Sequence, residues 1–377
     1  MITHISITKK GASQGVSTVV SQFEEDCFTQ AGHNTLRPKS IITPTTTYST
    51  KKNSISNKIL TKIKRIQLIY LLKMIISARN IVKKNLTILK KSRLIVCHDI
   101  FTLLFAFLYL SNKNNISLYN HSDSTPFITL RKNFNTSSCI KIINIIEKYI
   151  LAQKIYSIYS LSDDSTAFIK NLVHNKDCYF KTVNNFIVSK NNVHYSLNEV
   201  PKIFIVGTVC ERKRQMSFLE EVRKIKHPLL DSNSFYILGS ASSNDIEILN
   251  RLDFVYYIGN VSDIKKYLSF GDIILSVSSD EGLPMAMIEG ISSGCSIIST
   301  DVGGCNRICI DNENGYLIPT SLNKVNTILD LIYSICINKK IRHNFSVKSI
   351  ETFHANYSEK YALEFWSQEL SGTPCIE

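Results

Sequence analysis

Two glutamates, Glu281 and Glu289, lie in a segment whose other residues are mostly apolar or small, SSDEGLPMAMIEGISSGCSIISTDVGG at residues 278–304. An ionised carboxylate can accept hydrogen bonds from two neighbouring hydroxyl groups. A pair of such carboxylates therefore suits a ligand that carries a ribose and a sugar, with a diphosphate between them. The backbone N–H groups of a loop and of a helix N-terminus would supply the site for that diphosphate.

The elements around these glutamates are those of a strand followed by a helix. The run GDIILSVSS at residues 271–279 predicts a buried strand, and residues 280–283 form the loop at its carboxyl end. Pro284 suits the first turn of a helix, where its missing N–H costs nothing, and Gly294 suits the helix C-terminus. Glu281 is thus expected in the loop and Glu289 in the helix, both along one wall of a pocket.

The same strand and helix alternation extends through most of the 377 residues. It predicts an α/β fold with two doubly wound, Rossmann-like parallel sheets, because right-handed crossovers join parallel strands in this way. Such sheets bind ligands at the carboxyl ends of their strands, so we expect the chemistry in a cleft between the two domains. We expect strands at residues 2–8, 92–99, 115–123, 154–162, 202–209, 234–240, 254–259, 271–279, 295–302 and 315–319. Helices are expected at residues 15–32, 63–91, 214–226, 242–252, 262–270, 284–293 and 358–370.

A polar, Asn-rich stretch marks the boundary between the two domains. We place an N-terminal domain at residues 1–185, a linker at 186–201 and a C-terminal domain at 202–352. Residues 353–377 then form a C-terminal helix, which we expect to return to the N-terminal domain.

The net charge of +13 is concentrated in one segment, residues 51–93, which holds thirteen Lys or Arg and no Asp or Glu. Apolar residues are interleaved with the basic ones, as in one or two helices with a basic and an apolar face. Such a surface attracts nucleic acid or an anionic membrane surface, or it is merely a solvated helix. The apolar run at residues 94–110 is broken by His98 and Asp99, so we expect a buried strand and helix there and no membrane span.

Ten cysteines are scattered without a metal-binding spacing, and the N-terminal residues lack the apolar core of a signal peptide. Cys305 and Cys309 share a helix face at most, and two thiols alone make a poor zinc site. We therefore expect free thiols in a reducing cytoplasm and no bound metal or other cofactor.

The motif Glu281-Gly282-Leu283-Pro284, followed by Glu289 and the run STDVGG, resembles the E-x7-E region of a known enzyme family. That family is the retaining, nucleotide-sugar-dependent glycosyltransferases of family 4, which have the GT-B fold. The resemblance covers residues 206–319 and extends in outline to the N-terminal half. It includes VGTVCERKRQ at residues 206–215, YYIGNVSDIKKYL at 256–268 and NGYLIP at 314–319.

The resemblance implies roles for residues of the C-terminal domain. Arg212 and Lys213 would neutralise the leaving diphosphate, Glu281 would hold hydroxyls of the donor sugar, and Glu289 would bind the nucleotide ribose. Further donor-binding positions implied by these motifs are Gly207, Val261, Gly282, Leu283 and Pro284. Relatives of this kind need no metal and are thought to react with retention.

In the N-terminal half, Gly11 to Gly15 fall where the family keeps its acceptor-side glycine loop, and His121 falls where it keeps a sugar-contacting histidine. By this resemblance we count His121 with Glu281, Arg212 and Lys213 as catalytic, and Gly15 among the donor-binding residues. His98, also at the end of a strand, is a comparable residue for which we favour a structural or cleft-lining role. The sequence departs from the family at Thr208, where arginine is common, and at Arg214, where a glycine often follows the lysine. It also has Arg307 at a usually acidic position, which leaves the donor open.

The resemblance indicates a glycosyltransferase that moves a sugar to a glycan or lipid-linked glycan in bacterial surface polysaccharide synthesis, such as O-antigen, capsule or exopolysaccharide. We expect it in the cytoplasm, with the basic segment on the inner membrane face, and we expect no nucleic acid partner. A GT-B-fold epimerase or hydrolase of the nucleotide sugar is the alternative enzyme. A nucleic-acid-binding protein would explain the basic segment but leaves the glutamate motif unexplained.

Overall fold

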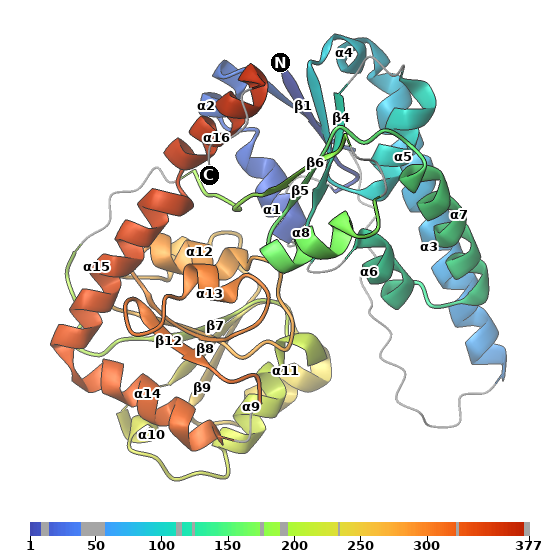
Figure 1. The fold of residues 1–377 in the computed structure, drawn as a ribbon. Helices are drawn as coiled ribbons and strands as arrows, with labels where there is room; N and C mark the ends of the chain where they lie inside the picture. Colours follow the sequence, from blue (N-terminus) through green and yellow to red (C-terminus); the bar gives the residue numbers. More distant parts are fainter. Residues whose placement is uncertain are drawn as a thin grey trace. The chain divides into compact units, whose positions relative to one another are not determined.

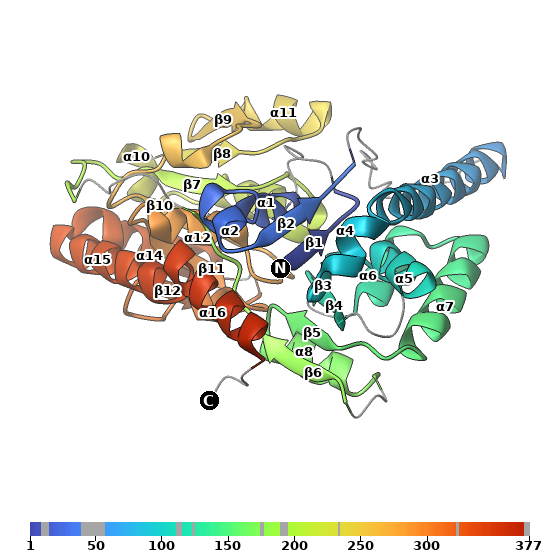
Figure 2. The ribbon, with the colours of Figure 1, turned by 90° about the horizontal axis from the view of Figure 1, so that it is seen from above.

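The structure is a computed structural model of the chain, and it describes residues 1–8, 15–38, 57–110, 115–122, 125–173, 177–188, 195–232, 234–321 and 324–372. The chain forms two compact units. The first contains Met1–Val183 with Leu363–Glu377, and the second contains Asn184–Ala362. Each unit is built on its own sheet, as Figures 1 and 2 show.

The first unit has a six-stranded, wholly parallel sheet in the order β2-β1-β3-β4-β5-β6. Its central strands are short and buried on both faces, as is usual when helices cover both sides of a parallel sheet. The strands are β1 (Ile2–Ile5), β2 (His33–Leu36), β3 (Leu94–Cys97), β4 (Asn115–Asn120), β5 (Ser157–Ser160) and β6 (Tyr179–Thr182).

The sequence does not predict β2 and β6, which are the two edge strands of this sheet. Their sequences, HNTL and YFKT, lack an apolar run because edge strands stay partly exposed. The prediction of a single helix at residues 15–32 is also wrong. A turn between α1 (Gly15–Gln22) and α2 (Asp26–Gln30) lets both Phe23 and Phe28 be buried, and these residues would lie about 140° apart around a continuous helix.

The predicted basic helical region forms α3 (Asn57–Lys84) and α4 (Leu86–Lys91). The predicted buried strand and helix at residues 94–110 are β3 and α5 (Ile100–Tyr109), and Asp99 caps α5 by accepting from the N–H groups of Phe101 and Thr102. In this unit α3, α5 and α7 pack against one another, and α8 lies on β5 and β6 (Figure 2). The remaining helices are α6 (Pro126–Asn133), α7 (Ser137–Leu151) and α8 (Asp163–Lys170).

The second unit has the same architecture, with a parallel sheet in the order β12-β11-β10-β7-β8-β9. Its strands are β7 (Ile203–Val206), β8 (Phe235–Leu238), β9 (Val255–Gly259), β10 (Ile273–Ser276), β11 (Ser296–Thr300) and β12 (Gly315–Ile318), all within predicted strands. Its helices are α9 (Gln215–Val222), α10 (Leu229–Ser232), α11 (Ser243–Leu249), α12 (Met285–Ser292), α13 (Cys305–Ile308), α14 (Val325–Ile337) and α15 (Lys339–Asn356).

The predicted helix at residues 262–270 is instead a single 3-10 turn, η2 (Ile264–Lys266). Asp263 caps it by accepting from the N–H of Lys265. The chain then turns toward β10, because the Asp272 carboxylate accepts from the N–H groups of Ser269 and Lys202. A second 3-10 turn, η1 (Glu211–Lys213), precedes α9.

The last helix, α16 (Glu359–Ser371), begins in the second unit, and its residues from Leu363 onward belong to the first. Trp366 is fully buried there, edge-on to His4 with ring centroids 5.2 Å apart. The Glu369 carboxylate pairs with Lys181 of β6 and accepts from the Tyr159 hydroxyl of β5 at 2.7 Å. The C-terminal helix thus returns to the N-terminal sheet, as predicted.

Candidate functional site

Glu281 lies at the carboxyl end of β10 and forms the centre of a charged cluster in the second unit. Its Oε1 lies 2.5 Å from Lys213 Nζ, and its Oε2 lies 3.2 Å from Arg212 Nη1. Ser278 Oγ donates a third contact to Oε1 at 2.7 Å. Loops after two adjacent strands, β7 and β10, supply these groups, so the structure brings together three of the predicted site residues.

The cluster pairs a buried carboxylate with a guanidinium that is half exposed to solvent. Glu281 is 6% exposed, whereas the Arg212 side chain is 48% exposed. Burial raises the pKa of Glu281, but the Lys213 ammonium and the Arg212 guanidinium outweigh burial and hold that pKa below its usual value. The carboxylate is therefore ionised at neutral pH, and its charge keeps the two cations at the strand ends.

Arg214, which follows the basic pair, has a structural role that the sequence reasoning missed. Its backbone has φ 53°, in the left-handed region that glycine adopts most easily, where the family often has glycine. Its guanidinium donates to the carbonyl oxygens of Val277, Ser278 and Thr320 at 2.6–2.8 Å. These bonds tie the turn that carries Lys213 to the loop that carries Glu281.

Two glycines allow the loops after β7 and β8 to approach closely. A Cβ atom on Gly239 would lie 2.1 Å from the Gly207 carbonyl oxygen, at a φ of +153°. A Cβ atom on Gly207, at φ +126°, would lie 3.3 Å from Lys213 Cε. The predicted donor-binding Gly207 thus leaves the space that the Lys213 side chain occupies.

The predicted residues Gly282, Leu283 and Pro284 lead into α12, with Pro284 as its N-cap. The Gly282 carbonyl accepts from Gly304 N at 2.7 Å, and the Leu283 carbonyl accepts from Asn185 Nδ2 at 2.9 Å. These two hydrogen bonds hold the loop before α12 in place through its carbonyl groups. In the first turn of α12 the Met287 N–H donates to the Pro284 carbonyl, whereas the N–H groups of Met285 and Ala286 have no partner among the described residues and remain available for an anion.

Glu289 lies on α12 and differs from Glu281 in its surroundings. Burial raises the pKa of its carboxyl to about 7, an effect that Lys265 opposes and Asp263 reinforces. Among the described residues, no side chain forms a hydrogen bond or ion pair with this carboxylate. Its neighbours are in η2, which packs against α12, and the predicted Val261 lies in the loop between β9 and η2.

The site residues predicted in the N-terminal half lie in the first unit. His121 follows β4 directly, and its Nε2 lies 2.8 Å from His98 Nδ1. Gly15 is the first residue of α1, whereas Gly11 lies outside the described residues. His98 continues into a chain with His4 and His33, whose positions within strands gave no sequence signal of a shared role.

No group of three or more His, Cys, Asp or Glu side chains that could hold a metal ion occurs in the described residues. Cys305 and Cys309 are both buried, and Cys309 follows the end of α13.

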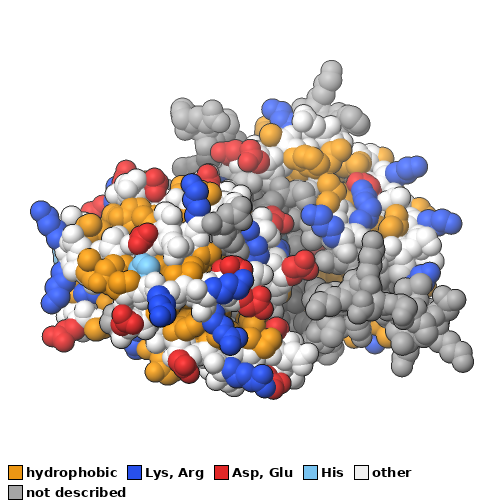
Figure 3. Space-filling model, turned by 90° about the horizontal axis from the view of Figure 1, so that it is seen from below, with side chains coloured by type: hydrophobic (Ala, Val, Ile, Leu, Met, Phe, Trp, Pro, Cys, Tyr) orange, Lys and Arg blue, Asp and Glu red, His pale blue; other side chains and the backbone are white. Residues whose placement is uncertain are grey.

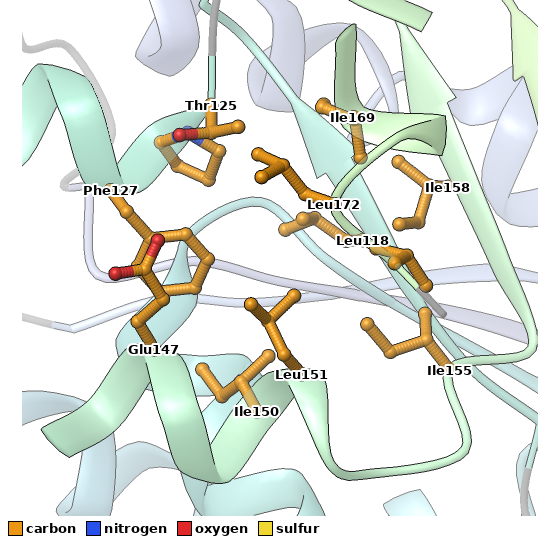
Figure 4. A pocket seen from close by; sticks show the side chains of 12 residues that line it. Leu118, Thr125, Phe127, Glu147, Ile150, Leu151, Ile155, Ile158, Ile169 and Leu172 are labelled. Carbon is orange, nitrogen blue, oxygen red and sulfur yellow. The ribbon is translucent and has the colours of Figure 1, made fainter. Parts of the chain in front are cut away.

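Figure 4 shows a cavity in the first unit that has a different character from the charged cluster. Its lining is almost wholly apolar, from β4, β5, α6, α7 and α8, and Phe127, Leu151 and Leu118 point into it. The carboxylate at its edge, Glu147, is already paired with Arg131 at 2.6 Å. This cavity therefore offers little to a charged ligand.

Residues 200–333, which include the charged cluster, match the family described as "Glycosyl transferases group 1". The chain is 26% identical over 265 residues to a poly(ribitol-phosphate) alpha-N-acetylglucosaminyltransferase of Staphylococcus aureus, covering 66% of this chain and 51% of that protein. It is 25% identical over 147 residues to an Escherichia coli UDP-Gal:alpha-D-GlcNAc-diphosphoundecaprenol alpha-1,3-galactosyltransferase, covering 36% of each chain. The chain thus spans about half or less of the length of these relatives.

Solved structures agree on the fold. Sucrose-phosphate synthase from Thermosynechococcus elongatus superposes with a TM-score of 0.65 at 16% identity, covering 98% of both chains. A lipopolysaccharide outer core galactosyltransferase gives a TM-score of 0.61 at 14% identity, covering 98% of this chain and 99% of that one. These solved structures share the GT-B arrangement of two parallel α/β sheets with this chain. The residues that match the glycosyl transferase group 1 family, 200–333, lie in the second unit.

Proposed function

We propose that this protein transfers a sugar from a nucleoside diphosphate donor to a glycan or lipid-linked glycan acceptor, with retention, as the family 4 enzymes do. The observation that carries the proposal is the pairing of Lys213 and Arg212 with the buried Glu281 carboxylate. Two cations held at the strand ends, beside the N-terminus of α12, form a site whose charge matches a diphosphate.

The contacts to Glu281 leave both cations able to bind a ligand. A lysine ammonium has three N–H donors and an arginine guanidinium has five, and each uses only part of them on Glu281. Arg212 also donates to the Asp280 carbonyl at 2.5 Å, which orients its planar group along the loop. The remaining donors bind the phosphate oxygens in this proposal.

The two glutamates take different parts in binding the donor. Glu289 has no side-chain partner among the described residues, so its carboxylate is free to accept hydrogen bonds from the nucleotide ribose. Glu281 binds hydroxyls of the donor sugar while it holds the cations. Val261 and the loop that contains it then lie beside the nucleotide end of the ligand, because η2 packs against α12.

The cations accelerate the reaction by stabilising the negative charge that develops on the diphosphate when its bond to the sugar is cleaved. Cleavage of the bond between the sugar and the diphosphate leaves negative charge on the phosphate oxygens. Arg212 and Lys213 are already in place to neutralise it, so no side-chain rearrangement is needed at that moment. The acceptor hydroxyl attacks on the face that the diphosphate leaves, which retains the configuration of the sugar.

The names of the relatives support a proposal for the class of product. They include enzymes named for O-antigen biosynthesis and for a diphosphoundecaprenol acceptor. We therefore place the reaction in bacterial surface polysaccharide synthesis, in the cytoplasm. The first unit binds the acceptor, and it also supplies His121 as a contact to the sugar and Gly15, at the N-terminus of α1, as a contact to the donor. Two solved relatives are complexes with UDP, which makes UDP the first nucleotide to test.

A membrane surface is the partner that we propose for α3 and α4. Ile69, Leu72 and Ile76 are 43%, 42% and 54% exposed and follow one another at helical spacing. They stand among exposed basic residues of α3, which include Lys73 and Arg79. Figure 3 shows one face of the molecule on which Lys and Arg side chains lie beside exposed apolar ones. No helix in the described part of the chain is long and apolar enough to cross a membrane.

This membrane partner can be tested by sedimentation with vesicles of phosphatidylcholine, with and without phosphatidylglycerol. We expect binding only to the anionic vesicles, with loss in Ile76→Glu and no change in Ile337→Glu. Ile337 is a matched control because it is 63% exposed on α14 of the second unit. Equal binding by both variants, or binding to short DNA in place of vesicles, would refute this partner.

The transferase proposal is tested by nucleotide release from a panel of nucleotide sugars, with and without bacterial lipid-linked glycans. A transferase releases nucleoside diphosphate only when the acceptor is present, and Lys213→Ala loses this activity. Release without an acceptor would instead favour a hydrolase of the same fold. Conversion of the nucleotide sugar without release would favour an epimerase.

A further inference from the structure

Four histidine side chains of the first unit form one continuous chain of ring-to-ring contacts. His33 Nδ1 lies 3.0 Å from His4 Nε2, and His4 Nδ1 lies 3.0 Å from His98 Nε2. His98 Nδ1 then lies 2.8 Å from His121 Nε2. His33 and His4 lie in β2 and β1, and His98 and His121 directly follow β3 and β4. These four strands are neighbours in the order β2-β1-β3-β4, so the row of histidines crosses most of the sheet.

Aromatic side chains hold these rings in place. His4 stacks on Phe23 with ring centroids 3.7 Å apart, and Trp366 lies edge-on to it. Tyr119 stacks on His98 and on His121, with centroids 4.9 Å and 4.5 Å apart. A ring flip in one histidine would require movement of a packed neighbour, so the order of the nitrogen atoms along the chain is fixed.

The rings are neutral at physiological pH. Burial lowers the pKa of His121 to about 3 and that of His33 to about 4. Burial also holds the pKa of His4 and His98 well below the usual value, helped by repulsion from the neighbouring rings. Each ring therefore carries one N–H and one bare nitrogen.

Neutral rings in this order have only two arrangements that satisfy all three contacts. Each contact needs one donor and one acceptor. If His4 donates from Nε2 to His33, its bare Nδ1 must accept from His98, which must then accept from His121. All four rings then carry the proton on Nε2. In the opposite arrangement all four carry it on Nδ1, and any mixture leaves two protons or two lone pairs facing each other.

We propose that His33, His4 and His98 are positioning residues that lock the tautomer of His121. Nδ1 is the His121 nitrogen that the chain leaves free, because Nε2 is used by His98. In one arrangement it is an obligate acceptor, and in the other it is an obligate donor. The row of histidines thus gives His121, the predicted sugar-contacting histidine, an uncharged ring nitrogen that either always donates or always accepts a hydrogen bond. A sugar hydroxyl is the ligand group that such an atom suits, and this part of the inference rests on the proposed function.

The lock itself can be tested without any substrate, by nuclear magnetic resonance of protein labelled with ¹⁵N at histidine. Protonated and bare ring nitrogens resonate in separate ranges, so the tautomer of each ring can be read directly. We expect His4, His33, His98 and His121 to show the same tautomer. In each ring one nitrogen should then have the ¹⁵N chemical shift of a fully protonated nitrogen, and the other that of a fully bare one. Different tautomers within the chain, or a charged ring, would overturn the proposal.

Two variants test the coupling between rings. In His98→Phe the contact to His121 is lost. We expect His121 then to exchange between its two tautomers, so that its two ¹⁵N shifts move toward an average value. In His4→Phe the contact between His98 and His121 remains, and these two rings should still share one tautomer. His354→Gln, an exposed histidine of α15 in the second unit, is the matched control and should change nothing.

If the ¹⁵N shifts of His121 do not change in a folded His98→Phe protein, the neighbouring histidines do not determine its tautomer. If either variant fails to fold, the four tautomers of the wild-type protein still decide the question. If the spectra agree but no sugar transfer is found, the tautomer lock stands and the proposed function fails.

Discussion

The Glu289 carboxyl should make the second unit less stable as the pH rises, and Glu289→Gln should remove this dependence. Its pKa is raised to about 7 in the folded protein, chiefly by burial, from 4.5 for an ordinary glutamate. Between these two values the folded protein binds a proton that the unfolded chain has already lost. Raising the pH through this window therefore lowers the free energy of unfolding.

The magnitude follows from the gap between the two pKa values. Each pKa unit corresponds to about 1.4 kcal/mol, so the gap gives about 3 kcal/mol. The side chain keeps some access to solvent, and we expect about 2–3 kcal/mol as a result. Gln does not titrate, so the variant should gain stability relative to the wild-type protein from about pH 4.5 to about pH 7, with no further gain at higher pH.

The assay is urea unfolding of both proteins, followed by far-ultraviolet circular dichroism at a series of pH values. The single tryptophan, Trp366, lies in the first unit, so its fluorescence separates the unfolding of that unit from that of the second. Glu220→Gln, an exposed change on α9, is the control and should show no pH-dependent difference. A constant difference between Glu289→Gln and wild type from pH 4 to pH 8 would refute this account of Glu289.

Three other changes test the packing around the two sheets. Arg214→Gly should lower the free energy of unfolding because three hydrogen bonds are lost, and Arg214→Ala should lower it by about 1 kcal/mol more, since alanine is strained at φ 53°. Equal free energies of unfolding for the two variants would contradict the strain. Gly239→Ala should cost more than about 1 kcal/mol in chemical unfolding and weaken nucleotide binding, because its Cβ would meet the Gly207 carbonyl. Glu369→Ala should shift the Trp366 fluorescence to longer wavelength, since α16 loses its polar contacts to the first sheet, and an unchanged spectrum would count against this anchor.

The strands of the second unit were predictable because their sequence signals are local. A buried strand such as β10 is a short apolar run, and Pro284 and Gly294 mark the limits of the helix that follows. The position of Glu281 at a strand end follows from that order alone. Its pairing with Lys213 was not predicted, since no local pattern joins residues 68 positions apart. The resemblance placed both residues in the donor site but gave them separate roles.

What the sequence did not indicate depends on contacts between distant residues. The edge strands β2 and β6 have too few apolar residues to be seen as strands, and they form because a neighbouring strand is present. Arg214 appeared only as a departure from a family pattern, although it holds two loops together. The histidine chain requires four strands to be placed in order across a sheet, and only His98 and His121 stood at recognisable strand ends.

The most direct test of the central claim is a thermal-shift measurement with UDP, GDP, ADP and CMP on wild type, Lys213→Ala and Lys224→Ala. Lys224 is the matched control because its ion pair with Glu221 is on the surface of the same unit. A nucleotide at about a hundred times its dissociation constant adds about 2.7 kcal/mol of stability. We predict that one diphosphate stabilises wild type and Lys224→Ala but not Lys213→Ala. Equal stabilisation of all three proteins would place the nucleotide elsewhere, and stabilisation of none would contradict a nucleotide-sugar donor.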